Sequence, residues 1–288
     1  MGAVAEETVV ARTPADRHRK KRDYDRPKFL YVVTGLTIAY LFAPIVIVLV
    51  FSFNERKSLA SWGGFSLKWY RDFLTNEEIR ASLLFSLEIA VIVMIVAAVL
   101  GTLMALGLKY ARSRFGSFAE TLLLLTLVAP ELATAVAAML LFTQFRVPLS
   151  GFTVVLGHVT FSIVFVALIV RSRLAGIGSE IEEAALDLGC PPMKAVRLVT
   201  IPLLWPAIMA GSLLVFVISF DNFVTSYFLT GIGTPPLPVM IYSMIRFGIS
   251  PTINAVGAFM MTLTVAVAAI AVLIYLWGTR RVRRSTSG

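Results

Sequence analysis

Six long apolar segments that contain no Lys or Arg constrain this chain more than any other feature. An α-helix rises about 1.5 Å per residue, so about 17 to 25 apolar residues cross the hydrocarbon core of a bilayer. The six segments are Phe29–Phe53, Ser82–Leu108, Thr121–Thr143, Phe152–Val170, Pro206–Leu229 and Asn254–Trp277. Because only 15% of the 288 residues are charged, we predict an all-α polytopic membrane protein with six transmembrane helices.

The distribution of Lys and Arg predicts the orientation of these helices, because basic residues concentrate in cytoplasmic loops. With the N-terminus inside, 19 of the 26 basic residues fall in inner segments and 7 in outer ones. We therefore expect both termini in the cytoplasm. The basic tails then contact membrane lipid at the inner leaflet, and we expect no binding of nucleic acid.

The same pattern divides the chain into five parts. They are a basic cytoplasmic N-terminal tail (1–28), a first transmembrane helix (29–53), an outer loop (54–81), a core of five transmembrane helices (82–277) and a basic cytoplasmic C-terminal tail (278–288). Within the outer loop, Leu67–Leu74 carries Trp69, Tyr70 and Phe73. Such rings favour the membrane–water boundary, so we predict a short interfacial helix there.

Motifs for covalent chemistry are absent from the sequence. It contains no G-x-x-x-x-G-K-[ST] loop, no H-E-x-x-H and no G-x-S-x-G. Cys190 is the only cysteine, and the two histidines, His18 and His158, lie far apart in the chain. We expect no catalytic residue, no metal site and no cofactor on this chain, and we read His158 as a hydrogen-bonded packing residue.

A charged segment, residues 176–205, separates the fourth and fifth apolar runs. Ser179 and Glu182 form an S-x-x-E pattern typical of a helix start, and Gly189 is suited to end that helix. The helix would carry small alanines and four acids, namely Glu180, Glu182, Glu183 and Asp187. Anionic lipid would repel these acids, so we predict a docking helix for a soluble protein partner.

A second short helix is expected directly after this turn. Pro191 and Pro192 suit its first turn, and Pro202 predicts its end just before the next span. The segment should therefore fold as two short cytoplasmic helices set at an angle by Gly-Cys-Pro-Pro.

The spacing within this segment resembles the EAA…G…I-x-L-P signature of permease subunits of binding-protein-dependent ABC importers. Glu183-Ala184-Ala185 is followed after three residues by Gly189 and after nine more by Val199-Thr200-Ile201-Pro202. The resemblance implies the type I importer fold (ABC transmembrane type-1), in which this loop is the coupling helix that docks in a groove of a separate ATPase. ATP and Mg would then bind that partner. The coupling residues would be Glu182, Glu183, Ala184, Ala185, Asp187 and Gly189.

Four further segments look like the second permease subunit of the spermidine/putrescine branch. They are Gly64–Leu74, Gly157–Val166, Ser219–Gly231 and Leu237–Ala255. The resemblance implies import of a polyamine through the cytoplasmic membrane of a bacterium. It also implies a second homologous permease, two ATPase subunits and an extracytoplasmic solute-binding protein as partners. Asn222 stands where the family often has a second acid after the Asp of its S-F-D motif.

Acids without bases inside the apolar runs agree with a path for a cation. Glu131 lies about 15 Å from the inner start of its run and Asp221 about 22 Å from that of its own. Phe220, Phe223 and Tyr227 lie near Asp221 and offer aromatic faces to an amine. Purely structural roles stay open, because Asp221 can bond across to another helix and Glu131 can accept hydrogen bonds freed at a proline kink.

Other functions stay open as well. The chain could serve an ABC importer for another small solute, or act as a self-sufficient secondary transporter or channel. The latter would need inverted repeats, broken spans with paired charges, or a selectivity filter. An intramembrane enzyme using Glu131 and Asp221 would lack a recognisable motif. An importer requires an ATPase to co-purify, whereas these last alternatives do not.

Overall fold

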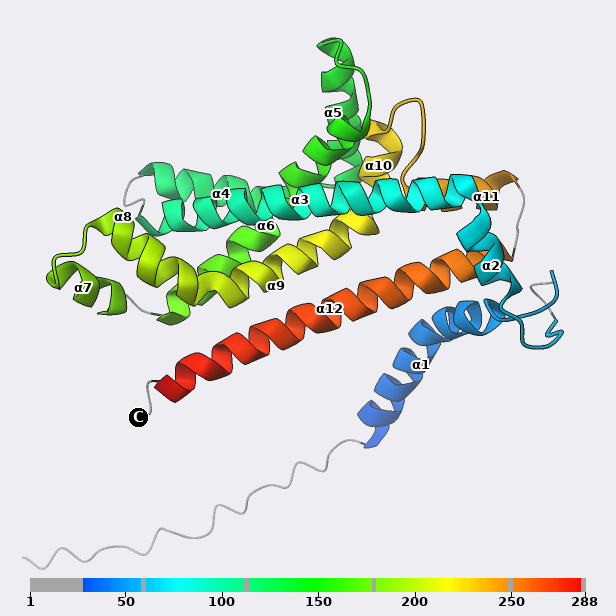
Figure 1. The fold of residues 1–288 in the computed structure, drawn as a ribbon, viewed down its shortest axis with the longest axis horizontal. Helices are drawn as coiled ribbons and strands as arrows, with labels where there is room; N and C mark the ends of the chain where they lie inside the picture. The colour runs from blue at the N-terminus through cyan, green and yellow to red at the C-terminus, as the bar shows by residue number, and fades with distance from the viewer. Residues whose placement is uncertain (1–27, 58–60, 111–113, 178–179, 248–250, 286–288) are drawn as a thin grey trace, which may run out of the picture. The chain divides into compact units, whose positions relative to one another are not determined.

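The computed structural model describes residues 28–57, 61–110, 114–177, 180–247 and 251–285 (Figure 1). The described part contains α-helices, one π-helical turn (η1) and an isolated bridge between Asn54 and Phe65, and it has no β-strand. The elements are α1 (Lys28–Phe51), α2 (Lys68–Thr75), α3 (Glu77–Tyr110), α4 (Arg114–Val128), α5 (Glu131–Gln144), α6 (Gly151–Ile177), α7 (Glu180–Asp187), α8 (Pro192–Ala195), η1 (Val196–Thr200), α9 (Ile201–Phe220), α10 (Val224–Leu229), α11 (Leu237–Phe247) and α12 (Thr252–Ser285). The predicted all-α fold is confirmed.

The chain divides into two units, Met1–Ile47 and Val48–Gly288. In the first unit, α1 is a continuous apolar helix that accommodates Pro44 in its interior. In the second unit, four helices are long and apolar enough to cross a membrane, and a bent pair of helices supplies a further span. The total is five spans including α1, or six if the bent pair counts as one, which matches the six apolar runs.

The bent pair corresponds to the predicted span Thr121–Thr143, which is not one straight helix. α4 ends at Val128 and α5 begins at Glu131, and the helix axis bends by 106° between them. Pro130 has no N–H to donate, and its backbone is extended (φ −60°, ψ 121°). The break therefore follows from the proline, and it places Glu131 at the first turn of a new helix.

The centre of the second unit is formed by α3, α6 and α9, and α12 runs along α9 (Figure 1). Fully buried valines from the three helices fill this core, among them Val93, Val166 and Val215. A Cβ atom at Gly101 on α3 would lie 2.7 Å from the Cβ of Val166 and 2.9 Å from the carbonyl oxygen of Ile163. The missing side chain at Gly101 thus lets α3 and α6 approach closely, as small residues commonly do in membrane bundles.

The helix predicted within residues 67–74 is present as α2, and two of its three aromatic side chains are buried inside the protein. Trp69 is 3% exposed and Phe73 is 1% exposed. The indole Nε1 of Trp69 donates a 2.6 Å hydrogen bond to the carbonyl oxygen of Asn54. Phe73 joins a buried cluster with residues of α3, α11 and α12. Both rings pack inside the protein, because α2 lies against α12 and α3.

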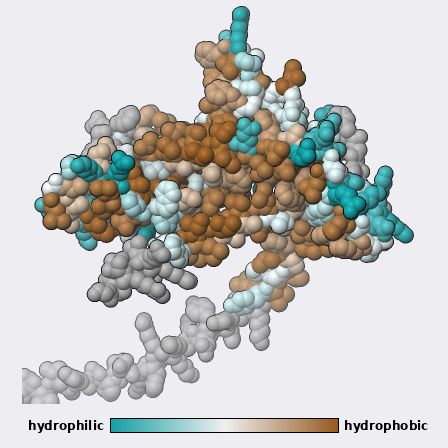
Figure 2. Space-filling view, viewed as in Figure 1, coloured by the Kyte–Doolittle hydropathy of each residue, from teal (hydrophilic) through white to brown (hydrophobic). Residues whose placement is uncertain are grey.

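The surface of the second unit is apolar along its length and polar towards its ends. Figure 2 shows hydrophobic residues over the middle of α3, and hydrophilic residues gathered near α7 and near α2. Leu84, Ile95, Val99 and Leu103 of α3 are all more than half exposed. Exposed apolar residues of this extent suit contact with lipid or with another membrane subunit.

Candidate functional site

Helix α7 ends in a Schellman turn built on Gly189. The N–H of Cys190 donates to the carbonyl of Ala185 at 3.0 Å, and the N–H of Gly189 donates to that of Leu186 at 2.9 Å. Gly189 has φ +83°, a conformation that favours glycine because it has no Cβ. The predicted helix end at Gly189 is therefore confirmed. Ser179, the proposed capping residue, lies outside the described residues.

Most side chains of helix α7 are exposed. None of its residues is buried, and Glu183, Ala184 and Asp187 are all exposed. Large apolar side chains are exposed beside it as well, because Leu188 in the turn that follows is 90% exposed and Met193 in α8 is 78% exposed. Acidic, small and large apolar groups are thus displayed together on one short segment.

The second short helix does not end at Pro202, contrary to the sequence prediction. It begins at Pro192, with Pro191 as its N-cap, as expected. From there α8, η1 and α9 form one continuous 29-residue helix that ends at Phe220. In the π-helical turn the N–H of Ile201 donates to the carbonyl of Val196, five residues back. This wider turn makes room for the ring of Pro202, which would clash with a carbonyl in a regular helix.

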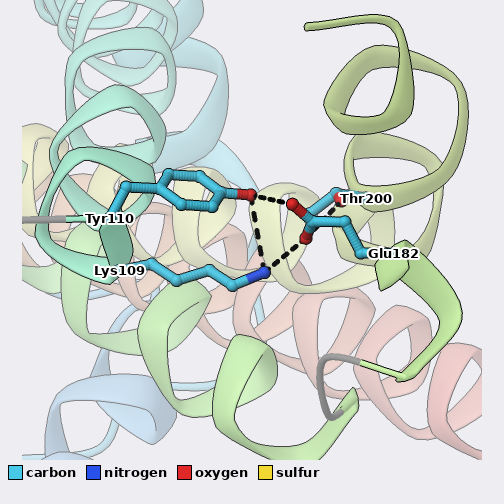
Figure 3. A network of polar contacts seen from close by, with 4 residues as sticks. All are labelled: Lys109, Tyr110, Glu182 and Thr200. Carbon is cyan, nitrogen blue, oxygen red and sulfur yellow. Dashed lines mark hydrogen bonds and ion pairs between the residues drawn. The ribbon is translucent and has the colours of Figure 1, made fainter. Parts of the chain in front are cut away.

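One carboxylate of α7 points back to the protein's own spans. Glu182 accepts hydrogen bonds from Lys109 Nζ at 2.5 Å, from Tyr110 Oη at 2.5 Å and from Thr200 Oγ1 at 3.2 Å (Figure 3). Burial raises the pKa of the Glu182 carboxyl, but the hydrogen bonds from Lys109 and Tyr110 outweigh burial and hold it below its ordinary value of 4.5. These four residues are referred to below as the Glu182 network.

A second polar group lies at two helix breaks within the bundle. Glu131, at the start of α5, accepts hydrogen bonds from Asn222 Nδ2 at 2.6 Å and from Thr225 Oγ1 at 3.2 Å. Asn222 also accepts a 2.9 Å hydrogen bond from the N–H of Thr225 through its Oδ1 atom, which supports the first turn of α10. The predicted span Pro206–Leu229 is therefore interrupted between Phe220 and Val224, close to the break at Pro130.

Asp221 and Glu131 have different partners. Asp221 follows the last residue of α9, is exposed, and accepts a 2.8 Å hydrogen bond from Thr264 Oγ1 on α12. The structure thus joins Glu131 to Asn222, the neighbour of Asp221, whereas Asp221 itself bonds across to another helix.

The aromatic residues predicted near Asp221 divide into two groups. Phe220 is 1% exposed and stacks on Phe216 inside the core. Phe223 and Tyr227 pack against each other and against Tyr242 of α11, with ring centroids 5.1 to 5.7 Å apart. The sequence analysis did not single out Tyr242, because its packing against Phe223 and Tyr227 brings together residues of two different helices.

His158 holds the break between α9 and α10 from the side of α6. It is 3% exposed, and its Nδ1 and Nε2 atoms lie 2.8 Å from Ser219 Oγ and 3.2 Å from Ser226 Oγ. The two serines flank the break, so the imidazole bridges its two sides. The prediction of a hydrogen-bonded packing residue is confirmed. Among the described residues, no three His, Cys, Asp or Glu side chains are grouped to hold a metal ion.

Comparison with known proteins identifies the family. Residues 97–286 match the binding-protein-dependent transport system inner membrane components. The chain belongs to this family. This permease is 33% identical to the putrescine transport system permease protein PotI of Escherichia coli K12 over 243 residues, which cover 82% of the permease and 86% of PotI. It is 34% identical to the spermidine/putrescine transport system permease protein PotC of Haemophilus influenzae over 253 residues, which cover 88% and 97% of the two chains.

Solved structures agree on the fold. A bacterial ABC transporter that imports the acidic polysaccharide alginate matches this permease with a TM-score of 0.66 at 15% identity, covering 87% of the permease and 97% of that chain. An amino acid ABC transporter matches with a TM-score of 0.58 at 17% identity, covering 73% and 99%. The permease therefore has the type I ABC importer fold. It is an inner-membrane transport component of a bacterial importer, and its family consists of transport components and not of catalysts.

Proposed function

We propose that this permease forms half of the translocation pathway of an ATP-driven importer and that α7 couples it to a separate ATPase subunit. A second homologous permease would complete the pathway, two ATPase subunits would bind ATP and Mg, and an extracytoplasmic binding protein would deliver the solute. Both termini would lie in the cytoplasm with α7. The observation that carries the proposal is the exposed face of α7, which ends in the Schellman turn at Gly189.

The coupling segment comprises Glu182, Glu183, Ala184, Ala185, Asp187 and Gly189. Small side chains at Ala184 and Ala185 let a partner's backbone approach α7, and the exposed carboxylates of Glu183 and Asp187 suit a basic groove. Immediately after the turn, one continuous helix runs from Pro192 to Phe220, about 43 Å at 1.5 Å per residue. Movement of the ATPase against α7 would thus reach the break at Asp221 and Asn222 through a single stiff element.

The solute is proposed to be a polyamine. Two relatives that cover more than four fifths of this chain are named as putrescine or spermidine/putrescine permeases. The carboxylates of Glu131 and Asp221 lie within or next to apolar helices, and no Lys or Arg occurs in these runs. A protonated amine would be attracted to both, and the rings of Phe223 and Tyr227, with Tyr242, add aromatic faces. Phe220 is buried in the core and would position the segment that carries Asp221.

Reconstitution tests the proposal. The permease would be placed in liposomes with its second permease, its ATPase and its binding protein, and ATP hydrolysis would be followed with putrescine, spermidine, and neutral or anionic solutes. We expect the ATPase to co-purify and the two polyamines alone to stimulate hydrolysis. Stimulation by a neutral or anionic solute instead would contradict the polyamine assignment and leave the importer assignment intact.

Two variants sharpen the experiment. Asp221→Asn should lower polyamine uptake, because it removes a negative charge without changing the size of the side chain. Asp72→Asn on α2 is the matched control and should transport normally. Uptake by the purified permease alone, without an ATPase, would contradict the importer assignment.

A further inference from the structure

We propose that Glu182 is a positioning residue that ties the coupling helix α7 to the permease's own spans α3 and α9, and does not contact the ATPase. The inference rests on the proposed role of α7 in coupling. The outward-facing acids of α7 would dock to the ATPase. The inward-facing Glu182 would transmit the displacement of α7 to the spans.

The first argument is that the Glu182 carboxylate accepts three hydrogen bonds within the chain. Its Oε2 atom accepts hydrogen bonds from Lys109 and Thr200, and its Oε1 atom accepts one from Tyr110 (Figure 3). Lys109 also supplies the opposite charge. Because both oxygens and the charge already have partners inside the chain, an ATPase side chain would gain little by binding Glu182 unless it displaced these donors.

The second argument concerns what else holds α7 in place. The helix has only eight residues, and none of them is buried. A helix of this length is not stable alone in water, so its position depends on contacts with the rest of the protein. Its extensive contacts are with α8 and η1, which follow it directly in the chain. The Glu182 network therefore supplies the connection from α7 to the end of α3.

A small cavity beside Glu182 supports close packing between α7 and the spans. It measures about 10 Å³ and is lined by residues of α3, α6, α7, η1 and α9. A volume of that size holds one water molecule at most. Solvent thus has little room on one side of the carboxylate, although the side chains of Lys109 and Glu182 remain 25% and 15% exposed.

The third argument is the contrast between two neighbouring acids. The side chain of Glu182 is 15% exposed, whereas Glu183 is exposed. Consecutive residues on a helix point about 100° apart, so they serve different surfaces. Glu183 is left for the partner, and Glu182 joins α7 to the end of α3 and to the π-helical turn that carries Thr200. A displacement of α7 then acts on both spans at once, and not only through the turn at 188–192.

The first test measures the position of α7 in the full permease without any ATPase. Cys190 is the only cysteine and lies in the turn after α7, so a spin label there reports the mobility of the turn. We expect Glu182→Gln to raise the mobile fraction about tenfold, because it removes the ion pair. Glu180→Gln, on an exposed residue of the same helix, should leave it unchanged. The charge exchange Lys109→Glu with Glu182→Lys should restore the immobile spectrum. An unchanged spectrum in Glu182→Gln would overturn the proposal.

The second test uses the complete reconstituted transporter. If Glu182 transmits displacement, Glu182→Gln should still co-purify its ATPase in normal amount, and solute-stimulated hydrolysis should fall towards the basal rate. The charge exchange should recover stimulation. Loss of the ATPase from Glu182→Gln, with no change in label mobility, would make Glu182 a docking residue and overturn the inference. Failure of wild-type permease to bind an ATPase would instead contradict the proposed function, whatever the label reports.

Discussion

Asn222 donates a 2.6 Å hydrogen bond to the carboxylate of Glu131 and so joins two helix breaks that lie far apart in the sequence. One break follows Pro130, and the other separates α9 from α10. Each break leaves backbone groups without helical partners, and such unsatisfied groups are costly inside a membrane. Pairing the breaks places an acid and an amide where both are satisfied, next to Asp221.

Neutralising Glu131 should impair transport of a cationic solute. We expect Glu131→Gln to reduce putrescine uptake in proteoliposomes about tenfold, because one charge-assisted contact with an ammonium group is lost. The exchange Glu131→Gln with Asn222→Asp retains one carboxylate and one amide at the same contact, so it should recover much of the uptake. Equal uptake by Glu131→Gln and the wild type would show that Glu131 serves only to hold the breaks together.

Reversing the charge of Glu183 should uncouple the permease from its ATPase. The side chain of Glu183 is exposed on α7, so Glu183→Lys should insert normally yet lose ATP-driven uptake. Membrane insertion is measured by the amount of protein in the membrane fraction, and coupling by stimulated hydrolysis. Glu78→Lys is the control and should remain coupled, because Glu78 lies at the end of α3 opposite to Lys109. Normal stimulation in Glu183→Lys would argue against docking at this face.

The turn at Gly189 should tolerate asparagine better than valine. A Cβ at this position would meet no atom within 4 Å, so the constraint is the backbone and not the space. A β-branched residue at φ +83° costs about 1 to 2 kcal/mol or more, whereas Asn adopts this region more readily. Gly189→Val should weaken ATPase association in a pull-down, and Gly189→Asn should largely preserve it. Gly176→Val, at an open site on α6, controls for side-chain volume.

A single methyl group at Gly101 should destabilise the bundle. We expect Gly101→Ala to cost about 1 to 3 kcal/mol, because the new Cβ would overlap Val166 and the carbonyl of Ile163. Gly107→Ala is the matched control on the same helix, with nothing within 4 Å, and should be neutral or slightly stabilising. The thermal unfolding midpoint in detergent distinguishes the two, and a midpoint for Gly101→Ala no lower than that of Gly107→Ala would contradict the close packing.

Acid should release α7 through protonation of Glu182. Its pKa lies below the ordinary value of 4.5, so the ion pair contributes fully above that value and is lost as the pH falls through the lowered pKa. A spin label at Cys190 should therefore become mobile below pH 4.5. In Glu182→Gln the label should be mobile at neutral pH and should not respond to acid in this range. A transition that persists in Glu182→Gln would assign it to another group.

The sequence predicted what depends on local pattern. Apolar runs located the spans, and Gly189 and Pro192 marked a helix end and a helix start correctly. It predicted the effect of proline on helices less well, because that effect depends on the surrounding backbone. Pro130 breaks a span, whereas Pro202 lies within a continuous helix because the preceding π-helical turn makes room for its ring.

Contacts between distant residues could not be predicted in the same way. Glu182 with Lys109, and Glu131 with Asn222, depend on how helices are rotated and shifted relative to one another. Periodicity within one segment carries no such information. The burial of Phe73 had the same origin, since it depends on where α2 lies against α12.

The fit of Gly101 against α6 limits how the bundle can rearrange. With a helix backbone seated directly on a neighbouring carbonyl, sliding one of these two helices along the other would drive bulkier side chains into the groove that now accepts only hydrogen. α3 and α6 are therefore expected to move as one rigid pair. A force applied to α3 near Lys109 would then also move α6 and His158.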